Sequence, residues 1–435
     1  MTTLDHDLRL SRAAAQRGRA LVSRLVLCAT LASSIMLLPA LVGPLPAAET
    51  KIQPRAAAES EQTQALRAKV QEYIDQGMIS GAVVATGTSK GIYNIVSVGV
   101  RDLGTEQPME VNTFFRIASM TKPMTALGIM ILIDEGKLSI DDEVEKYLPE
   151  FQGQMLVESR EKDRVVLVKP SRKITIKDLL THTSGLGPAP PGLKDLYQKR
   201  DRTLAEGVMA FSQQPLVFEP GTKWAYCNQG IDTLGRIIEV VSGQAYEDFL
   251  KARIFDPVGM KRTYFFPHPG VLDLLATLYE ENDGELVPSS KAIIDYGVKM
   301  RYPLPAGGLI SCAPDLANFC EMMLGRGEIH GRRVVSTKRW ELMTSVHTGD
   351  LEPGFVPGMG FGLGVGVVRE PQGVTAMLSP GSFGHGGAFG TQYWMDPKQD
   401  LFVILLIQRT GIKNSDGSDL RRDIQQIAVD TMPSE

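Results

Sequence analysis

The chain is poor in cysteine, histidine and tryptophan. Its 435 residues include 4 Cys, 6 His and 3 Trp. Cys28 lies in an apolar N-terminal segment, which leaves Cys227, Cys312 and Cys320 for the rest of the chain. An odd number of cysteines excludes a complete disulfide framework in an exported protein, and no metal-ligand cluster accompanies them. We therefore expect three buried free thiols and no metal site; a Cys312–Cys320 bridge is the alternative.

The chain also lacks a strong charge of either sign. Lys and Arg number 46 against 50 Asp and Glu, so the formal net charge is −4. Residues 1–48 carry 5 basic and 2 acidic residues, and without them the balance is 41 against 48, or −7. A mildly acidic protein does not attract a phosphate backbone, so the composition excludes nucleic acid as a partner.

Only one long apolar run is present, at residues 25–42. An arginine-rich segment precedes it and a small-residue stretch at 44–48 follows, an arrangement typical of a secretory signal cleaved near Ala48. We expect an exported protein, periplasmic or extracellular, that contacts a membrane only if the signal stays as an uncleaved anchor. Residues 49–59 have the composition of a linker, and residues 60–431 would form a single domain.

The spacing of apolar residues predicts helices and strands in separate blocks. A helix ending at Gly77 precedes β runs at 82–86 and 92–100, which a turn joins into a hairpin. The middle of the chain is mostly helical, with a small strand pair at 165–168. Helices in this middle part include 141–147, 176–180, 204–211 and 230–242. The later part is expected to contain a helix at 314–323, β runs at 361–368, 375–378, 390–395 and 401–407, and a helix at 420–429.

This order indicates an α/β (α+β) fold. We expect an antiparallel sheet flanked by helices and built from both chain ends, about residues 60–120 and 300–431. A mostly helical lobe, about residues 121–299, is inserted between them.

The stretch from Phe115 to Pro123 carries the strongest chemical signal. It places Ser119 and Lys122 three residues apart, at the start of an apolar run at 124–133 that is expected to be a buried helix. Residues three apart on a helix share a face, so the two side chains can share a proton. Lysine can accept the serine proton only if burial lowers its pKa by several units. The helix N-terminus would favour an oxyanion beside Ser119.

The spacing alone is weak, because Ser159 and Lys162 share it in a charged segment that we interpret as solvated surface. A second element, Tyr226-Cys227-Asn228, lies between predicted helices. In an extended segment Tyr226 and Asn228 point to one side. A tyrosine phenolate held charged by a lysine could take the serine proton, and the amide could orient the amine and a substrate carbonyl. The alternative is that Tyr226 is a packed core aromatic.

These two ordered motifs resemble those of the serine β-lactamase and penicillin-binding-protein superfamily. The likeness is to the class C β-lactamase-like branch, which also holds D,D-peptidases, D-aminopeptidases and esterases. It spans about residues 61–429. Supporting stretches lie in the same order, at 180–186, 220–222, 306–309 and 384–387. In this family setting we interpret His182 as a brace for its loop; a triad with Ser184 or Ser119 is the alternative.

The third motif of that family is Lys-Thr-Gly or a variant, and here the matching place is His385-Gly386-Gly387. Histidine thus replaces a lysine that helps to bind a carboxylate, and we expect only a fractional charge on it at neutral pH. The resemblance implies an oxyanion hole at the backbone N–H groups of Ser119 and Ala388. Gly386 and Gly387 would let a substrate approach closely.

Together these observations predict an exported serine hydrolase that cleaves an ester or amide through an acyl-Ser119 intermediate. Lys122 and Tyr226 would move the proton and Asn228 would orient the reacting groups, without a metal or organic cofactor. The substrate would be a small molecule or a peptide, with cell-wall material among the alternatives. A D,D-carboxypeptidase, a true β-lactamase, or a wall-binding or penicillin-sensing protein without turnover are the rival hypotheses.

Overall fold

The structure is a computed structural model that describes residues 60–188, 191–193, 195–290, 299–353, 355–412 and 415–432. All of them belong to one compact unit, residues 57–435. The predicted signal and linker lie outside the described residues. Within the described part of the chain, no helix has the length and apolar character that a membrane crossing requires.

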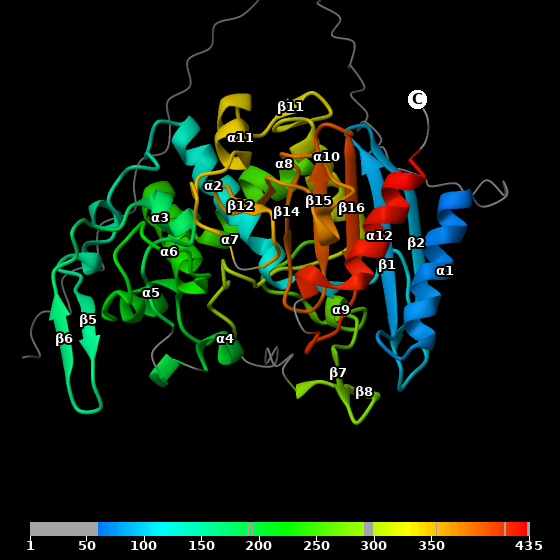
Figure 1. The fold of residues 1–435 in the computed structure, drawn as a ribbon, viewed down its shortest axis with the longest axis horizontal. Helices are drawn as coiled ribbons and strands as arrows, with labels where there is room; N and C mark the ends of the chain where they lie inside the picture. The colour runs from blue at the N-terminus through cyan, green and yellow to red at the C-terminus, as the bar shows by residue number, and fades with distance from the viewer. Residues whose placement is uncertain are drawn as a thin grey trace, which may run out of the picture. The chain divides into compact units, whose positions relative to one another are not determined.

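An eight-stranded antiparallel sheet forms the centre of this unit, in the order β12-β13-β14-β15-β16-β1-β2-β3 (Figure 1). Its strands are β1 (Gly81–Thr88), β2 (Gly91–Asp102), β3 (Gln107–Pro108), β12 (Met359–Phe361), β13 (Gly366–Val368), β14 (Phe383–Gly386), β15 (Gln392–Asp396) and β16 (Leu401–Leu406). The first strand of the chain pairs with the last, so Val83 lies opposite Leu406. The prediction of a sheet built from both chain ends is confirmed.

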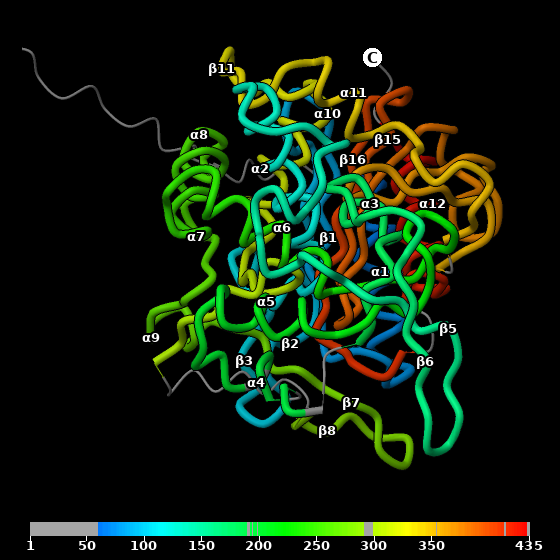
Figure 2. The backbone as a smooth tube through the Cα atoms, turned by 90° about the vertical axis from the view of Figure 1, so that its left-hand side faces the viewer, coloured from blue at the N-terminus to red at the C-terminus, as the bar shows by residue number. Residues whose placement is uncertain are grey.

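Two helices from the chain ends cover one face of the sheet. They are α1 (Glu61–Asp75) and α12 (Asp419–Asp430), which lie side by side in Figures 1 and 2. Leu66 of α1 and Ile424 of α12 pack in one apolar cluster with Val84 and Val403 of the sheet. The side chains of Ser60 and Ser418 cap the two helix N-termini, as short hydroxyl side chains commonly do.

The other face of the sheet packs against α2 (Lys122–Asp134) and α10 (Ala313–Leu324). Every residue of α2 from Lys122 to Ile133 is buried. A helix that is buried all round must be enclosed by other elements, and α2 also contacts α6 (Asn228–Ser242), α7 (Tyr246–Leu250) and α11 (Thr337–Thr344). It is the element on which the sheet and the helical region meet.

The helical region lies between α2 and α10 in sequence. It contains α3 (Ile176–Leu180), α4 (Leu196–Lys199), α5 (Leu204–Ser212), α6, α7, a π-helical turn η5 (Lys251–Phe255), α8 (Asp256–Val258) and α9 (Pro269–Leu272). Small two-stranded sheets pair β5 (Leu156–Arg160) with β6 (Val165–Val168), β7 (Tyr279–Asn282) with β8 (Glu285–Pro288), β4 (Phe115–Arg116) with β9 (Ile310–Ser311), and β10 (Glu328–Ile329) with β11 (Arg332–Arg333). The mostly helical middle segment is confirmed.

Local predictions are wrong at two places, and one helix was missed. The helix expected at 141–147 is only a 3₁₀ turn, η2 (Val144–Lys146), because Glu143 is extended and the Val144 N–H donates to Ile174 instead of starting an α-helix. The strand expected at 375–378 follows another 3₁₀ turn, η7 (Gly373–Thr375), and forms no ladder. The helix α11 was not predicted.

The outer layer gives a stability test. Ile424→Ala removes a side chain that is 0% exposed and should destabilise the fold by about 2 to 5 kcal/mol through lost burial and a residual cavity. Gln426→Ala on the exposed side of the same helix is the matched control and should change stability little. Urea denaturation of both variants measures this; equal midpoints would show that α12 does not depend on packing against the sheet.

Candidate active site

Ser119 lies in a 3₁₀ turn, η1 (Ala118–Thr121), directly before α2. The spacing predicts Ser119 in the first turn of the helix, whereas it lies in the 3₁₀ turn that precedes the helix. Ala118 has φ of 46°, a left-handed conformation that is unfavourable for a residue with a side chain. Surrounding contacts hold it there: Thr121 Oγ1 donates to the Ala118 carbonyl at 2.7 Å, and the Ile117 N–H donates to Leu309 at 3.1 Å.

Lys122 is the first residue of α2 and is 0% exposed. Its Nζ lies 2.9 Å from Ser119 Oγ and donates to the Ala306 carbonyl at 2.6 Å. Burial lowers the lysine pKa to about 7, although the negative charge of Asp232, and that of the Cys227 thiolate at high pH, act in the opposite direction. A large fraction of the amine is therefore unprotonated at neutral pH. In that form it can keep its bond to Ala306 and accept the Ser119 proton.

Tyr226 completes the contact with these two residues. Lys122 Nζ lies 4.7 Å from the centre of its ring, and Ser119 is close enough to its hydroxyl to act on the pKa of the phenol. Burial raises the pKa of the Tyr226 phenol well above its ordinary value. The interaction with Ser119 lowers this pKa, but its effect is smaller than that of burial. The structure therefore does not support the expected phenolate, because burial disfavours the anion and Lys122 is not a full cation. Tyr226 is a neutral phenol that can relay a proton.

Asn228 is the first residue of α6, and Cys227 before it is the extended N-cap residue. The predicted extended segment thus ends at Cys227. Lys122 Nζ forms hydrogen bonds with Ser119 and Ala306, and the Asn228 side-chain oxygen has no hydrogen-bond partner among the described residues. The structure therefore offers no contact through which Asn228 would orient the amine.

His385 lies in β14 and is 5% exposed. Its Nδ1 is 2.7 Å from the Gly386 carbonyl, so that nitrogen carries the hydrogen and donates it. Burial, and then the neighbouring Lys122, lower the pKa of the imidazole to about 3. The fractional charge expected from the sequence is wrong, because the surrounding protein removes the water that would stabilise the cation. His385 is neutral.

The end of β14 is fixed against the turn that carries Ser119. Thr391 Oγ1 donates to the Ile117 carbonyl at 3.2 Å. A Cβ atom at Gly387 would lie 2.1 Å from Thr391 Oγ1 and 2.5 Å from the Ile117 oxygen, so only glycine fits there. The packing of the chain, and not only a substrate, requires this glycine. The Ala388 N–H follows it and has no backbone acceptor among the described residues, as an oxyanion donor requires.

His182 braces the segment that presents Tyr226. Its carbonyl accepts from the Ala225 N–H at 2.9 Å and its Nδ1 accepts from the Cys227 N–H at 3.2 Å. Burial lowers the pKa of its imidazole well below the ordinary value. The interpretation of His182 as a brace is confirmed by these contacts.

The cysteines Cys227, Cys312 and Cys320 are free and buried, which confirms the prediction of three buried free thiols.

Aromatic side chains surround this constellation. The Phe355 ring lies 5.2 Å from the Tyr226 ring and 5.4 Å from the Trp224 ring, both edge-on. Phe355 and His385 also line a pocket whose other walls are mostly apolar, formed by Pro353, Val356, Met359, Gly360, Phe361, Gly366, Gly384, Gly386, Trp394, Asp416 and Arg421. The side of the site next to β14 is therefore apolar and aromatic.

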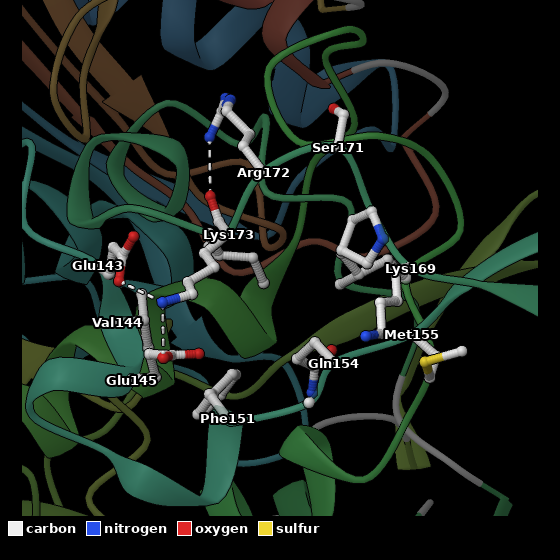
Figure 3. A pocket seen from close by; sticks show the side chains of 14 residues that line it. Glu143, Val144, Glu145, Phe151, Gln154, Met155, Lys169, Ser171, Arg172 and Lys173 are labelled. Atoms are coloured by element: carbon white, nitrogen blue, oxygen red, sulfur yellow. Dashed lines mark hydrogen bonds and ion pairs between the residues drawn. The ribbon is translucent and has the colours of Figure 1, made fainter.

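A separate pocket of about 420 Å³ lies away from these residues (Figure 3). Its rim is already ion-paired: Lys173 lies 2.8 Å from Glu143 and 2.9 Å from Glu145, as the dashed lines in Figure 3 show. Arg172 also lies 2.6 Å from Asp178. None of the proposed catalytic side chains lines it. Among the described residues, no group of three or more His, Cys, Asp or Glu side chains is placed to hold a metal ion.

The sequence does not predict the roles of Asp232 and of Ala306, although Ala306 belongs to the supporting stretch 306–309. Ala306 supplies the carbonyl that holds Lys122 and lies 184 residues from it in sequence, so no local pattern links the two. Asp232 left a visible signal, since it is an acidic residue among buried positions of a predicted helix, and such a position needs buried partners.

A family model described as Beta-lactamase matches residues 66–427, and the chain therefore belongs to the β-lactamase family. Together with the relatives below, this match confirms the resemblance to the serine β-lactamase and penicillin-binding-protein superfamily. The observed sheet flanked by helices agrees with that fold. Membership supports a serine-hydrolase-like function.

Protein Rv1367c of Mycobacterium tuberculosis is 32% identical over 361 residues, which cover 79% of this chain and 89% of that protein. Esterase EstB of Burkholderia gladioli is 27% identical over 372 residues, which cover 78% of this chain and 90% of the esterase. Among solved structures, EstCE1, "a hydrolase with promiscuous acyltransferase activity", matches with a TM-score of 0.72 and 25% identity, over 85% of this chain and 98% of that one.

The lowered pKa of Lys122 predicts the pH dependence of the site. If the unprotonated amine takes the Ser119 proton, kcat/KM for a neutral ester should rise with pH and reach half its plateau near pH 7. Stopped-flow or plate hydrolysis of p-nitrophenyl butyrate between pH 5 and 9 measures this. Lys122→Arg keeps the positive charge, but arginine does not release its proton at any of these pH values. The variant should therefore lose most activity at every pH. An active arginine variant would show that Lys122 acts only through its charge.

Proposed function

We propose that this protein is an exported serine hydrolase that cleaves neutral esters through an acyl-Ser119 intermediate. The observation that carries the proposal is the 2.9 Å contact between Ser119 Oγ and a fully buried lysine whose pKa is lowered to about 7. A serine hydroxyl needs such a base to become a nucleophile. Export rests on the N-terminal sequence alone.

Acylation would begin with transfer of the Ser119 proton to the Lys122 amine as Oγ attacks the ester carbonyl. The backbone N–H groups of Ser119 and Ala388 would stabilise the oxyanion of the tetrahedral intermediate. When the carbonyl–alkoxide bond breaks, the leaving oxygen takes a proton from Lys122, relayed by the neutral Tyr226 hydroxyl. Lys122 is then again unprotonated, and the acyl group is attached to Ser119.

Deacylation would repeat these steps with water as the nucleophile. The unprotonated Lys122, acting through Tyr226, accepts a proton from water as the water oxygen attacks the acyl carbonyl. Collapse of the second tetrahedral intermediate releases the carboxylic acid, and the proton returns to Ser119 Oγ. No net proton remains on the enzyme, so the cycle closes.

A neutral substrate suits the pocket better than a carboxylate. His385 is uncharged where the family motif places a lysine, and burying a carboxylate without a charged partner is costly. The neighbouring walls are mostly apolar and aromatic, with Asp416 and Arg421 as the charged residues of the lining, and the apolar part favours an uncharged acyl or alcohol group. The similarity to an esterase over 78% of this chain supports the same choice. Amide, peptide and β-lactam substrates, which often present a carboxylate, are the less favoured alternative.

Removal of the nucleophile tests the proposal. Ser119→Ala should lower hydrolysis of short-chain p-nitrophenyl esters by about a thousand-fold or more, because no acyl-enzyme can form. The matched control is Ser184→Ala in the neighbouring loop, whose hydroxyl has no contact with Lys122 among the described residues and which should keep most activity. Ester hydrolysis that survives in Ser119→Ala would contradict the assignment.

The neutral His385 predicts a second result. The ratio of cephalosporin acylation to ester hydrolysis should stay constant between pH 6 and 7.5, because His385 does not titrate there. His385→Lys should raise that ratio about 5- to 30-fold by adding a charge that binds the cephalosporin carboxylate. Acylation is followed by intact-protein mass spectrometry. A ratio that rises as the pH falls in the native protein would show that the histidine takes up a proton.

A further inference from the structure

Asp232 is a carboxylic acid deep inside the protein, on the second turn of α6. It is 0% exposed. Oδ2 accepts from the hydroxyls of Tyr197 at 2.8 Å and Tyr302 at 2.9 Å, and Oδ1 accepts from the Ala306 N–H at 2.9 Å. Three neutral donors thus satisfy this group, and Lys122 is the cation that acts on its pKa. Burying a carboxylate costs free energy, so its presence in the core needs an explanation.

The Ala306 backbone connects Asp232 to the catalytic lysine. Its N–H donates to Asp232, and its carbonyl accepts from Lys122 Nζ at 2.6 Å. The preceding residues are fixed as well: Thr125 Oγ1 donates to the Pro305 carbonyl at 2.8 Å, and Arg200 Nε donates to the Tyr302 carbonyl at 2.8 Å. The acceptor of the lysine amine is therefore held in one place from both sides.

We propose that Asp232 is a positioning residue that fixes the Ala306 carbonyl under Lys122 and adjusts the charge of the lysine amine from within the core. This role rests on the proposed function, because it assumes that Lys122 is the base for Ser119. It adds to that function a residue that touches neither substrate nor nucleophile. Asp232 would act on Lys122 in two ways. Its hydrogen bond to the Ala306 N–H fixes the carbonyl that accepts from Lys122, and its negative charge raises the pKa of the lysine.

The charged and titratable groups around Lys122 come from several elements. They are Tyr226 and Cys227 before α6, Asp232 in α6, His182 after α3 and His385 in β14. The two histidines and Tyr226 are neutral, and burial raises the pKa of the Cys227 thiol to about 11. Asp232 is the group of this set that is ionised near neutral pH, since its pKa, although raised by burial, is about 6.

The phenols around Asp232 are neutral. Burial holds the pKa values of Tyr197, Tyr302 and Tyr246 well above the ordinary phenol value. Arg200 lies beyond Tyr302 and donates to backbone carbonyls. The negative charge of Asp232 is thus not neutralised next to it, and it acts on the lysine.

This charge keeps the amine a useful base. Burial alone would lower the Lys122 pKa further, and a weaker base takes the serine proton less readily. The Asp232 charge opposes burial and leaves the pKa of the lysine near neutral pH, where a large fraction is unprotonated yet still basic. The fold thus sets the base strength by two opposed effects.

Asp232→Asn tests the role, because the amide keeps the shape and can still accept from Ala306. The probe is a fluorophosphonate, and the readout is its rate of attachment to Ser119 as a function of pH, which reports one step without a natural substrate. The pH of half-maximal rate should fall by about one unit when a charge this close is removed. The plateau rate should fall about threefold because the amine is a weaker base.

Asp315→Asn is the matched control. Asp315 is also buried, accepts from Thr263 Oγ1 at 2.8 Å and has a pKa raised by burial, but it lies on α10 and acts on Cys312, not on Lys122. It should lower the melting temperature and leave the pH of half-maximal labelling unchanged. A melting curve of each variant shows how much stability is lost.

The outcomes separate the two proposals. If the native protein is not labelled at Ser119, the proposed function fails. If Ser119 is labelled and Asp232→Asn leaves the half-maximal pH in place, or shifts it no more than Asp315→Asn does, Asp232 is only a structural residue and this inference alone is overturned. A downward shift confined to Asp232→Asn supports it.

Discussion

The burial of Lys122 is the constraint on which the rest of the site depends. Lowering a lysine pKa from its usual value to about 7 corresponds to roughly 5 kcal/mol. Since the unfolded chain holds this proton more tightly, burial destabilises the fold fully below about pH 7, and the cost disappears above the usual lysine pKa of 10.5. The helix α2 is buried from Lys122 to Ile133 between the sheet and the helical region. The apolar core that packs around it stabilises the fold and offsets this cost.

The same burial determines the chemistry of the neighbours. It keeps Tyr226 a phenol, His385 a neutral imidazole and the amine of Lys122 partly unprotonated. A site assembled from neutral groups can activate Ser119 without a permanent charge facing the substrate. Backbone groups then do the positioning: the Ala306 carbonyl holds the amine, and the end of β14 packs against the carbonyl of Ile117 next to the nucleophile. The design agrees with an enzyme for neutral esters.

The local features of this site could be predicted from the sequence, and the long-range ones could not. Ser119 and Lys122 lie three residues apart before an apolar run, so their pairing and the helix α2 follow from spacing. The alternation and turn residues gave the strands β1, β2 and β16. The start of α6 at Asn228 depends on the extended Cys227, and the carbonyl of Ala306 comes from a segment far along the chain. The charge of His385 depends on burial, which no single residue reveals.

Direct titration of the lysine tests the central claim. In protein labelled with ¹³C at the lysine ε carbon, NMR gives one signal for each lysine side chain. The signal that disappears in Lys122→Arg is the signal of Lys122. Chemical shifts followed from pH 5 to 11 report the pKa of each amine. We predict that the signal assigned to Lys122 titrates near pH 7, well below the usual lysine value of 10.5. A Lys122 signal that titrates near pH 10.5 would contradict the account, because the amine would then be a cation and no base for Ser119.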